Sequence, residues 1–91
     1  MIAPRVHLNG TDGRILRDQY RAAVIALSDA MTALRAIEIH GRDYYTIQGD
    51  NEACNKAYHT RLGMVNMVKE IQNELSLVEM HIIEQLEERS R

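Results

Sequence analysis

The side chains best suited to chemistry surround two adjacent tyrosines near the middle of the chain. Tyr44 and Tyr45 directly follow Arg42 and Asp43. Tyrosine rings offer flat stacking surfaces and hydroxyl donors, and a guanidinium can bind a phosphate or carboxylate through two parallel hydrogen bonds. Such a group can hold an aromatic base with its phosphate, or can form the hot spot of a protein interface. It can equally cap a hairpin core, with Arg42 and Asp43 bonded to loop amides.

A second polar group lies earlier, in residues 7–11. His7 and Asn9 neighbour a turn glycine, just before an expected helix whose first backbone amides favour anions. We expect this segment and the tyrosine segment, contributed by different protomers, to enclose one small anionic ligand. The predicted ligand-binding residues are His7, Asn9, Arg42, Asp43, Tyr44, Tyr45, Gln48 and His59.

Three arginines follow this segment at helical spacing. Arg14, Arg17 and Arg21 fall on one side of the expected helix. Asp12 and Asp18 lie next to them in the sequence and partly neutralise their charge. We interpret the arginines as a solvated face, because exposed charges of this kind contribute little to stability.

Nucleophilic or metal chemistry has little support. Cys54 falls on an apolar stripe, where a cysteine is usually an inert core residue. His81 and Glu84 stand three residues apart, but a di-metal bundle needs Glu-x-x-His pairs from two helices, and this order is reversed and occurs once. The four histidines show no zinc-type spacing. We therefore expect no catalytic residue, no metal site and no cofactor, and the protein is not predicted to be an enzyme.

The composition restricts the class of protein. The chain has 91 residues, enough for a single domain (1–91), with 13 acidic against 11 basic side chains and a formal charge of -2. No apolar run approaches the roughly 18 residues of a membrane-spanning helix, and no basic cluster suits duplex DNA. The first residues lack a secretory pattern and Cys54 is the only cysteine. A protein of the cytoplasm is therefore expected, without a membrane or duplex DNA as partner.

Apolar spacing predicts two long helices that position these groups. The first stripe predicts a helix over 12–40, ended by Gly41 in a left-handed cap, and the second predicts a helix over 50–89 with Asp50 as its N-cap. The loop 41–49 is short, so the helices should be antiparallel neighbours. The stripe residues are Leu16, Tyr20, Ala23, Leu27, Ala30, Leu34 and Ile37 in the first helix, and Met64, Val68, Ile71, Leu75, Val78 and Ile82 in the second.

Residues 1–11 complete this arrangement as an extended arm that packs one face down, through Ile2, Val6 and Leu8. The predicted fold is therefore all-α: an antiparallel helical hairpin with an extended N-terminal arm. Gly63 interrupts the second helix at a cost of about 1 kcal/mol relative to Ala, which indicates a tolerated glycine, a close backbone neighbour or a bend.

The second helix also predicts self-association. At about 1.5 Å per residue it outreaches the first helix, roughly 57 Å against 43 Å. It carries apolar residues off its stripe that a two-helix hairpin cannot bury. We therefore expect a helical homo-oligomer, since one small core rarely stabilises such a chain. The expected oligomer interface contains Met67, Leu77, Met80 and Ile83.

Several short motifs resemble a group of small, mostly uncharacterised proteins encoded by bacteriophages and prophages. These motifs are His7 to Thr11, Gly41 to Tyr45 with Gln48 and Gly49, Tyr20, and His59 to Leu62. The resemblance implies a phage accessory protein acting in the bacterial cytoplasm, and small helical phage proteins of hairpin shape include oligomeric sponges for nucleotide signals of host immunity. Two hypotheses follow: an anti-defence binder that sequesters a small anionic nucleotide-like ligand, and an interaction protein that grips and inhibits a host protein through its helices and tyrosine loop.

Overall fold

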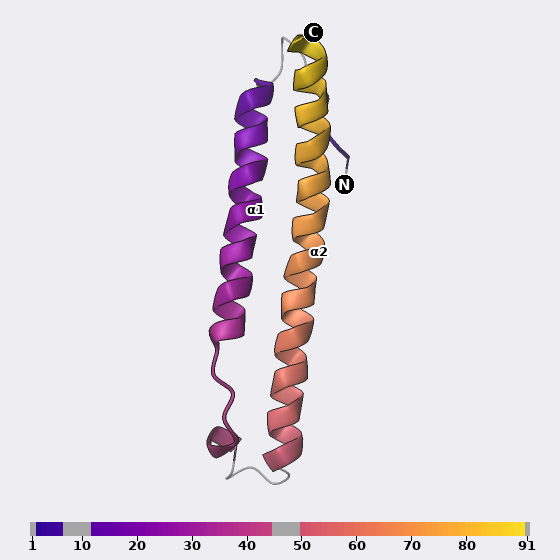
Figure 1. Cartoon of the computed structure of the whole chain (residues 1–91). Coiled ribbons are helices and arrows are strands. Elements are labelled where there is room, and N and C mark those ends of the chain that lie inside the picture. The colour runs from indigo at the N-terminus through magenta and orange to yellow at the C-terminus, as the bar shows by residue number, and fades with distance from the viewer. Residues whose placement is uncertain (1, 7–11, 45–49, 91) are drawn as a thin grey trace.

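The protein folds as an antiparallel helical hairpin (Figure 1). The computed structural model describes residues 2–6, 12–44 and 50–90, and contains α1 (Gly13–Ala36), the short 3-10 helix η1 (Gly41–Tyr44) and α2 (Asp50–Ser90). No strand occurs among these residues, so the predicted all-α hairpin is confirmed. The rod measures 64 × 20 × 18 Å. We call the end that carries η1 the closed end and the opposite end the open end.

Helix α1 begins where the sequence predicts and ends four residues early. The Asp12 side chain caps it by accepting a hydrogen bond of 2.8 Å from the Arg14 amide. The helix stops at Ala36 because Ile37 adopts an extended conformation, with ψ of 122°. Gly41 therefore does not cap α1: its φ lies outside the left-handed region, and it begins η1 instead.

Side chains from α2 explain the early end of α1. The Arg61 guanidinium donates hydrogen bonds to the carbonyl oxygens of Arg35 (3.4 Å) and Ile37 (2.6 Å). The Tyr58 hydroxyl donates to the carbonyl of Ile39 at 3.4 Å. These bonds satisfy carbonyls that lack a partner once the helix has ended. Tertiary contacts thus outweigh the apolar spacing that continued as far as Ile37.

The buried hydrophobic cluster lies towards the open end, and Met31 and Val65 are buried outside this cluster. Val78 and Ile82 of α2 are buried in the cluster with Val6 of the N-terminal arm. The α1 stripe is half-buried as predicted, apart from Ile37, which is exposed. In α2, however, Met64 and Ile71 are exposed although they belong to the predicted stripe. Partly buried residues that pack against this core are Ala3, Leu16, Tyr20 and Leu86.

Polar residues fix the register of the two helices and explain why Met64 and Ile71 of the predicted α2 stripe are exposed. The Gln72 amide donates to the Val24 carbonyl (2.9 Å) and to the Ser28 hydroxyl (2.6 Å). Nearer the open end, Glu79 is largely buried and lies 3.7 Å from the Arg21 guanidinium. Gln72 and Glu79 are seven residues apart and face α1, so Ile71, one position away, points about 100° from them.

The N-terminal arm lies along the end of α2, and of the apolar residues predicted to pack there, Val6 does. The Val6 amide donates to Oε1 of Gln85 at 2.7 Å, and Nε2 of Gln85 donates to the Pro4 carbonyl at 3.1 Å. Arg89 adds a hydrogen bond of 2.9 Å to the Val6 carbonyl. Val6 is buried and Ile2 is exposed, whereas Leu8 lies outside the described residues.

Two glycines of the helices have opposite surroundings. A Cβ at Gly63 would meet nothing within 4 Å, so the glycine is tolerated without a close backbone neighbour. A Cβ at Gly13 would lie 2.8 Å from both Val6 Cγ1 and Leu86 Cδ2. The absence of a side chain at Gly13 therefore lets the arm and α2 close against the start of α1.

The hairpin buries little surface for its size. Its accessible area is 7125 Å², whereas a folded monomer of 10.4 kDa exposes about 5,400 Å². The radius of gyration of 19.7 Å compares with about 12 Å for a globular domain of this length. The chain is thus a rod with a thin core. Among the helices over the described residues, none is both long and apolar enough to cross a membrane.

The predicted interface residues do not share one face of α2. At about 100° per residue, Met67, Leu77, Met80 and Ile83 spread over more than half of the helix circumference. The first three are exposed, whereas Ile83 is half-buried and lines a depression with Arg14. A single flat interface cannot contain all four side chains.

Candidate anion-binding site near the closed end

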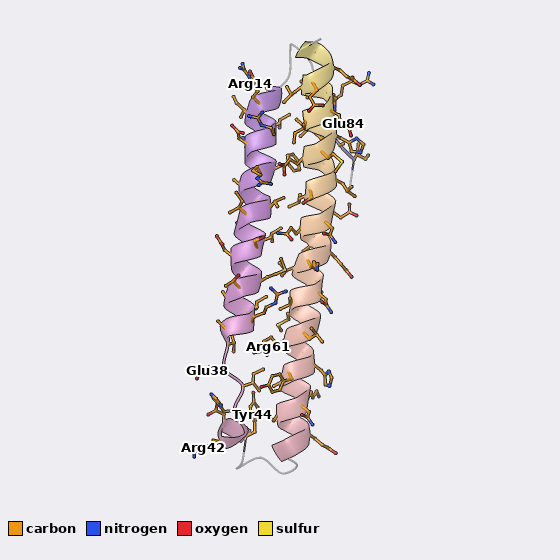
Figure 2. The ribbon with its side chains drawn as sticks, viewed as in Figure 1. Arg14, Glu38, Arg42, Tyr44, Arg61 and Glu84 are labelled. Atoms are coloured by element: carbon orange, nitrogen blue, oxygen red, sulfur yellow. The ribbon has the colours of Figure 1, made fainter. Side chains whose placement is uncertain are left out.

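The predicted tyrosine group lies at the closed end of the rod, where Figure 2 labels Arg42 and Tyr44. Arg42 and Asp43 are exposed on η1, and Tyr44 is half-buried. His59 is exposed on the first part of α2. The other predicted ligand-binding residues, Tyr45, Gln48, His7 and Asn9, lie outside the described residues.

The described residues that flank the two halves of the predicted ligand site lie at opposite ends of the hairpin. Val6 and Asp12, which flank residues 7–11, lie at the open end, whereas η1 lies at the closed end (Figure 1). The long dimension of the rod is 64 Å. The expectation that both halves, contributed by different protomers, enclose one ligand stays a prediction, because residues 7–11 and 45–49 lie outside the described residues.

Tyr44 lines an apolar groove on one side of the closed end. This groove, of about 420 Å³, runs between the end of α1 and the start of α2. Most of its walls are aliphatic, so it suits an apolar side chain better than a phosphate. The lining residues are Leu34, Ile37, Glu38, Ile39, Tyr44, Ala53, Lys56, Ala57, Thr60, Arg61 and Met64.

A second depression, which we call the basic pocket, collects positive charge. It has a volume of about 330 Å³ and includes His59 of the predicted set, but not Arg42, Asp43 or Tyr44. No acidic side chain occurs among the described residues that line it. The lining residues are Arg35, Tyr58, His59, Arg61, Leu62, Val65, Asn66 and Lys69.

Arg61 and Tyr58 hold the basic pocket in shape. The guanidinium carbon of Arg61 lies 5.0 Å from the centre of the Tyr58 ring, a cation–π contact. The two hydrogen bonds from Arg61 Nη1 to α1 carbonyls aim this side chain across the hairpin, between the helices as labelled in Figure 2. Both side chains thus connect α2 to the chain that leaves α1, which makes the pocket wall rigid.

The three arginines of α1 nearest the open end each lie next to a carboxylate. Arg14 lies 3.3 Å from Asp12, Arg17 lies 3.1 Å from Asp18, and Arg21 pairs with Glu79. The hydrogen bonds from Arg14 lower the pKa of the Asp12 carboxyl, and the same contact raises the pKa of Arg14. Arg14 and Arg17 thus lie beside the acidic residues that the sequence places next to them, whereas Arg21 differs from the expected solvated face because its partner Glu79 is largely buried. Within the described ranges, Arg35 and Lys69 form no salt bridge of this kind.

Five polar residues of the basic pocket are not among the predicted ligand-binding residues: Arg35, Tyr58, Arg61, Asn66 and Lys69. The signal is partly local, since Tyr58, Arg61 and Lys69 repeat at helical intervals along α2. Arg35 comes from α1 and joins them only through the register of the hairpin. That register depends on hydrogen bonds such as those of Gln72, which spacing alone does not reveal.

Metal and nucleophile chemistry remain without a built site in the described part of the chain. Cys54 is half-buried on α2. Nδ1 of His81 lies 3.8 Å from Glu84, but no group of three metal-ligating side chains occurs among residues 2–6, 12–44 and 50–90.

Comparisons with known protein families, with curated protein sequences and with solved structures find no match to this chain.

Proposed function

We propose that this protein is a non-enzymatic binder of a small anionic, nucleotide-like ligand, and that the basic pocket holds that ligand. The observation that carries the proposal is the concentration of Arg35, Arg61 and Lys69 around one depression whose described lining has no carboxylate. The chain as a whole has a charge of -2. A local concentration of cations on an acidic chain attracts anions to that one place.

The residue types match the parts of a nucleotide. Arg35 and Lys69 supply charge for a phosphate, and Asn66 supplies amide donors and an acceptor. The Tyr58 ring is half-exposed and offers a surface on which an aromatic base can stack. The volume of about 330 Å³ lies at the lower end of the range for small-molecule sites, which matches a ligand the size of a mononucleotide.

The resemblance to short phage proteins suggests the role of such a binder. A protein that holds a signalling nucleotide without converting it lowers the free concentration of that signal. In the cytoplasm of an infected bacterium this activity would oppose nucleotide-dependent immunity. The proposed role is therefore anti-defence sequestration by a phage-type accessory protein.

Calorimetric titration tests this proposal. Wild-type protein is titrated with inorganic phosphate and with a panel of linear and cyclic nucleotides. We expect Lys69→Ala and Arg35→Ala each to weaken nucleotide binding about five- to tenfold, since one charge contact with phosphate in water contributes on the order of 1 kcal/mol. Lys56→Ala is the matched control, because Lys56 lines the apolar groove and not the basic pocket.

Two results would contradict the proposal. The first is that no nucleotide of the panel binds wild-type protein at millimolar concentration. The second is that Arg42→Ala abolishes binding while Lys69→Ala and Arg35→Ala leave it unchanged, which would move the site to η1, as the sequence predicts. Thermal melts of all variants show whether a loss of binding reflects a loss of fold.

A second candidate function is an interaction protein that inhibits a host protein. It is favoured by Leu77 and Met80, two exposed apolar side chains one turn apart on α2, away from the basic pocket. If they form a partner surface, Leu77→Lys should abolish a stoichiometric complex with a purified host protein while nucleotide binding persists. An unchanged complex would refute this candidate.

A further inference from the structure

One side of α2 carries a row of large apolar side chains that the hairpin leaves uncovered. Met64 is 48% exposed, Met67 is 65% exposed and Ile71 is 52% exposed. They follow each other at intervals of three and four residues, so they share one face of the helix. We call Met64, Met67 and Ile71 the open stripe. Met64, the stripe residue nearest the closed end, also lines the apolar groove, together with Ile37 of the chain that leaves α1.

The open stripe continues a surface that is covered further along α2. Met64, Ile71 and Val78 are spaced by seven residues, and Val78 is only 2% exposed. Val78 is covered because the N-terminal arm packs there, with Val6 in the same cluster and Gln85 bonded to the arm backbone. This face of α2 is therefore covered by the arm near the open end and uncovered from Met64 to Ile71, with half-buried Leu75 and exposed Glu74 between the two parts.

The whole rod exposes enough surface to supply a protein interface. The chain exposes about 1,700 Å² more than a globular monomer of its mass, from its accessible area of 7125 Å². Each partner in a standard stable interface contributes about 800 Å². Docking a second hairpin along α2 would therefore remove about half of the surface that this rod has in excess. The three side chains of the stripe are uncharged, and a twofold interface brings together the same patch of both copies.

We propose that the open stripe is a dimer interface, and that its occupant is the open stripe of a second copy of this chain. The Met and Ile side chains of one copy cover the apolar groove of the other, next to Met64. Methionine suits this role because its flexible thioether fills irregular gaps. The interface excludes the opposite side of α2, where Leu77 and Met80 lie.

Sedimentation and light scattering at micromolar concentration test the proposal with a matched pair of variants. We expect wild-type protein to have twice the 10.4 kDa mass of the chain. Ile71→Lys should reduce the mass to that of a monomer, because an interface core tolerates charge poorly. Leu77→Lys should remain a dimer, although Leu77 is 53% exposed, almost the same as Ile71. Both positions are half-exposed in the hairpin, so far-UV circular dichroism should show folded helices in both.

Oxidation of the wild-type protein by dilute peroxide provides a second test that needs no substitution. Methionine sulfoxide formation follows exposure, and Met80, at 54%, serves as an internal reference for Met64 and Met67. We expect oxidation of Met64 and Met67 to slow several-fold as the protein concentration rises into the micromolar range, with Met80 unchanged. A monomeric wild type, a monomeric Leu77→Lys beside a dimeric Ile71→Lys, or equal oxidation of all three methionines would overturn the proposal.

Discussion

Alanine at Gly63 and alanine at Gly13 should change stability in opposite directions. Gly63 lies within α2, and an added Cβ would meet nothing within 4 Å. Alanine is favoured over glycine in a helix by about 0.5 to 1 kcal/mol, so Gly63→Ala should stabilise the hairpin by that amount. For a domain of this length this corresponds to a rise in Tm of about 3 to 8 °C. The helix content should not change.

The same methyl group at Gly13 has no room. It would lie 2.8 Å from Val6 Cγ1 and 2.8 Å from Leu86 Cδ2, closer than carbon atoms pack. Leucine can rotate its end away, but Val6 is β-branched and held by the Gln85 hydrogen bond, so the arm must shift. Overpacking of this kind costs about 1 to 3 kcal/mol, and Gly13→Ala should therefore melt below wild type.

Differential scanning calorimetry at one fixed protein concentration measures both variants, since association makes Tm depend on concentration. The decisive comparison is the sign of the two shifts in Tm. A Gly63→Ala protein that melts below wild type would refute the reasoning, because it would mean that another backbone packs against this glycine. A Gly13→Ala protein as stable as wild type would show that the arm does not pack on α1 in solution.

Three further predictions concern the ends of the helices. Gln85→Ala should release the arm and make the peptide bonds around Val6 sensitive to protease, whereas Gln85→Glu should release it only in part, because a carboxylate still accepts from the Val6 amide but cannot donate to Pro4. Asp12 has a lowered pKa in the folded protein, so its contribution to stability is present above the ordinary carboxyl pKa and is lost as the pH falls through the lower folded value; the Tm of Asp12→Ala should therefore approach that of wild type in acid. Arg61→Ala should speed hydrogen exchange in the last turn of α1 and leave the exchange of α1 at the open end unchanged.

The fold was predictable because its strongest signals are periodic. Apolar residues recur at helical intervals within each helix, as Leu16 and Tyr20 do in α1 and Val78 and Ile82 do in α2. The predicted connection of nine residues is short, so the helices can only be antiparallel neighbours. The end of α1 was not predictable, because it is set by Arg61, a residue far away in the sequence. The exposure of Met64 and Ile71 was not predictable for a related reason. The side of α2 that faces α1 contains the polar residue Gln72, whereas the apolar spacing predicts that Ile71 faces α1.

The location of the candidate site was predictable, but most of its residues were not. The sequence predicts functional groups at the closed end, and these include His59, which lines the basic pocket. It favoured Arg42 and Asp43 because they adjoin two tyrosines, whereas the structure collects Arg35 and Lys69 from two helices. A site shared between helices depends on their relative rotation, and in this chain that rotation is fixed by single hydrogen bonds.

The order of the cross-links along the rod also has a consequence for how the chain folds. Hydrogen bonds from α2 join residues 24 apart at Arg61, 44 apart at Gln72 and 83 apart at Arg89, the last of them to the N-terminal arm. Once the closed end has formed, each further contact closes only a small additional loop. If the most distant pair were joined first, the entropic cost of loop closure would be about 1 kcal/mol higher than for the nearest pair. Folding should therefore proceed like a zipper from Arg61 towards the arm. Substitutions at the closed end should slow folding, while those at Gln85 should mainly accelerate unfolding.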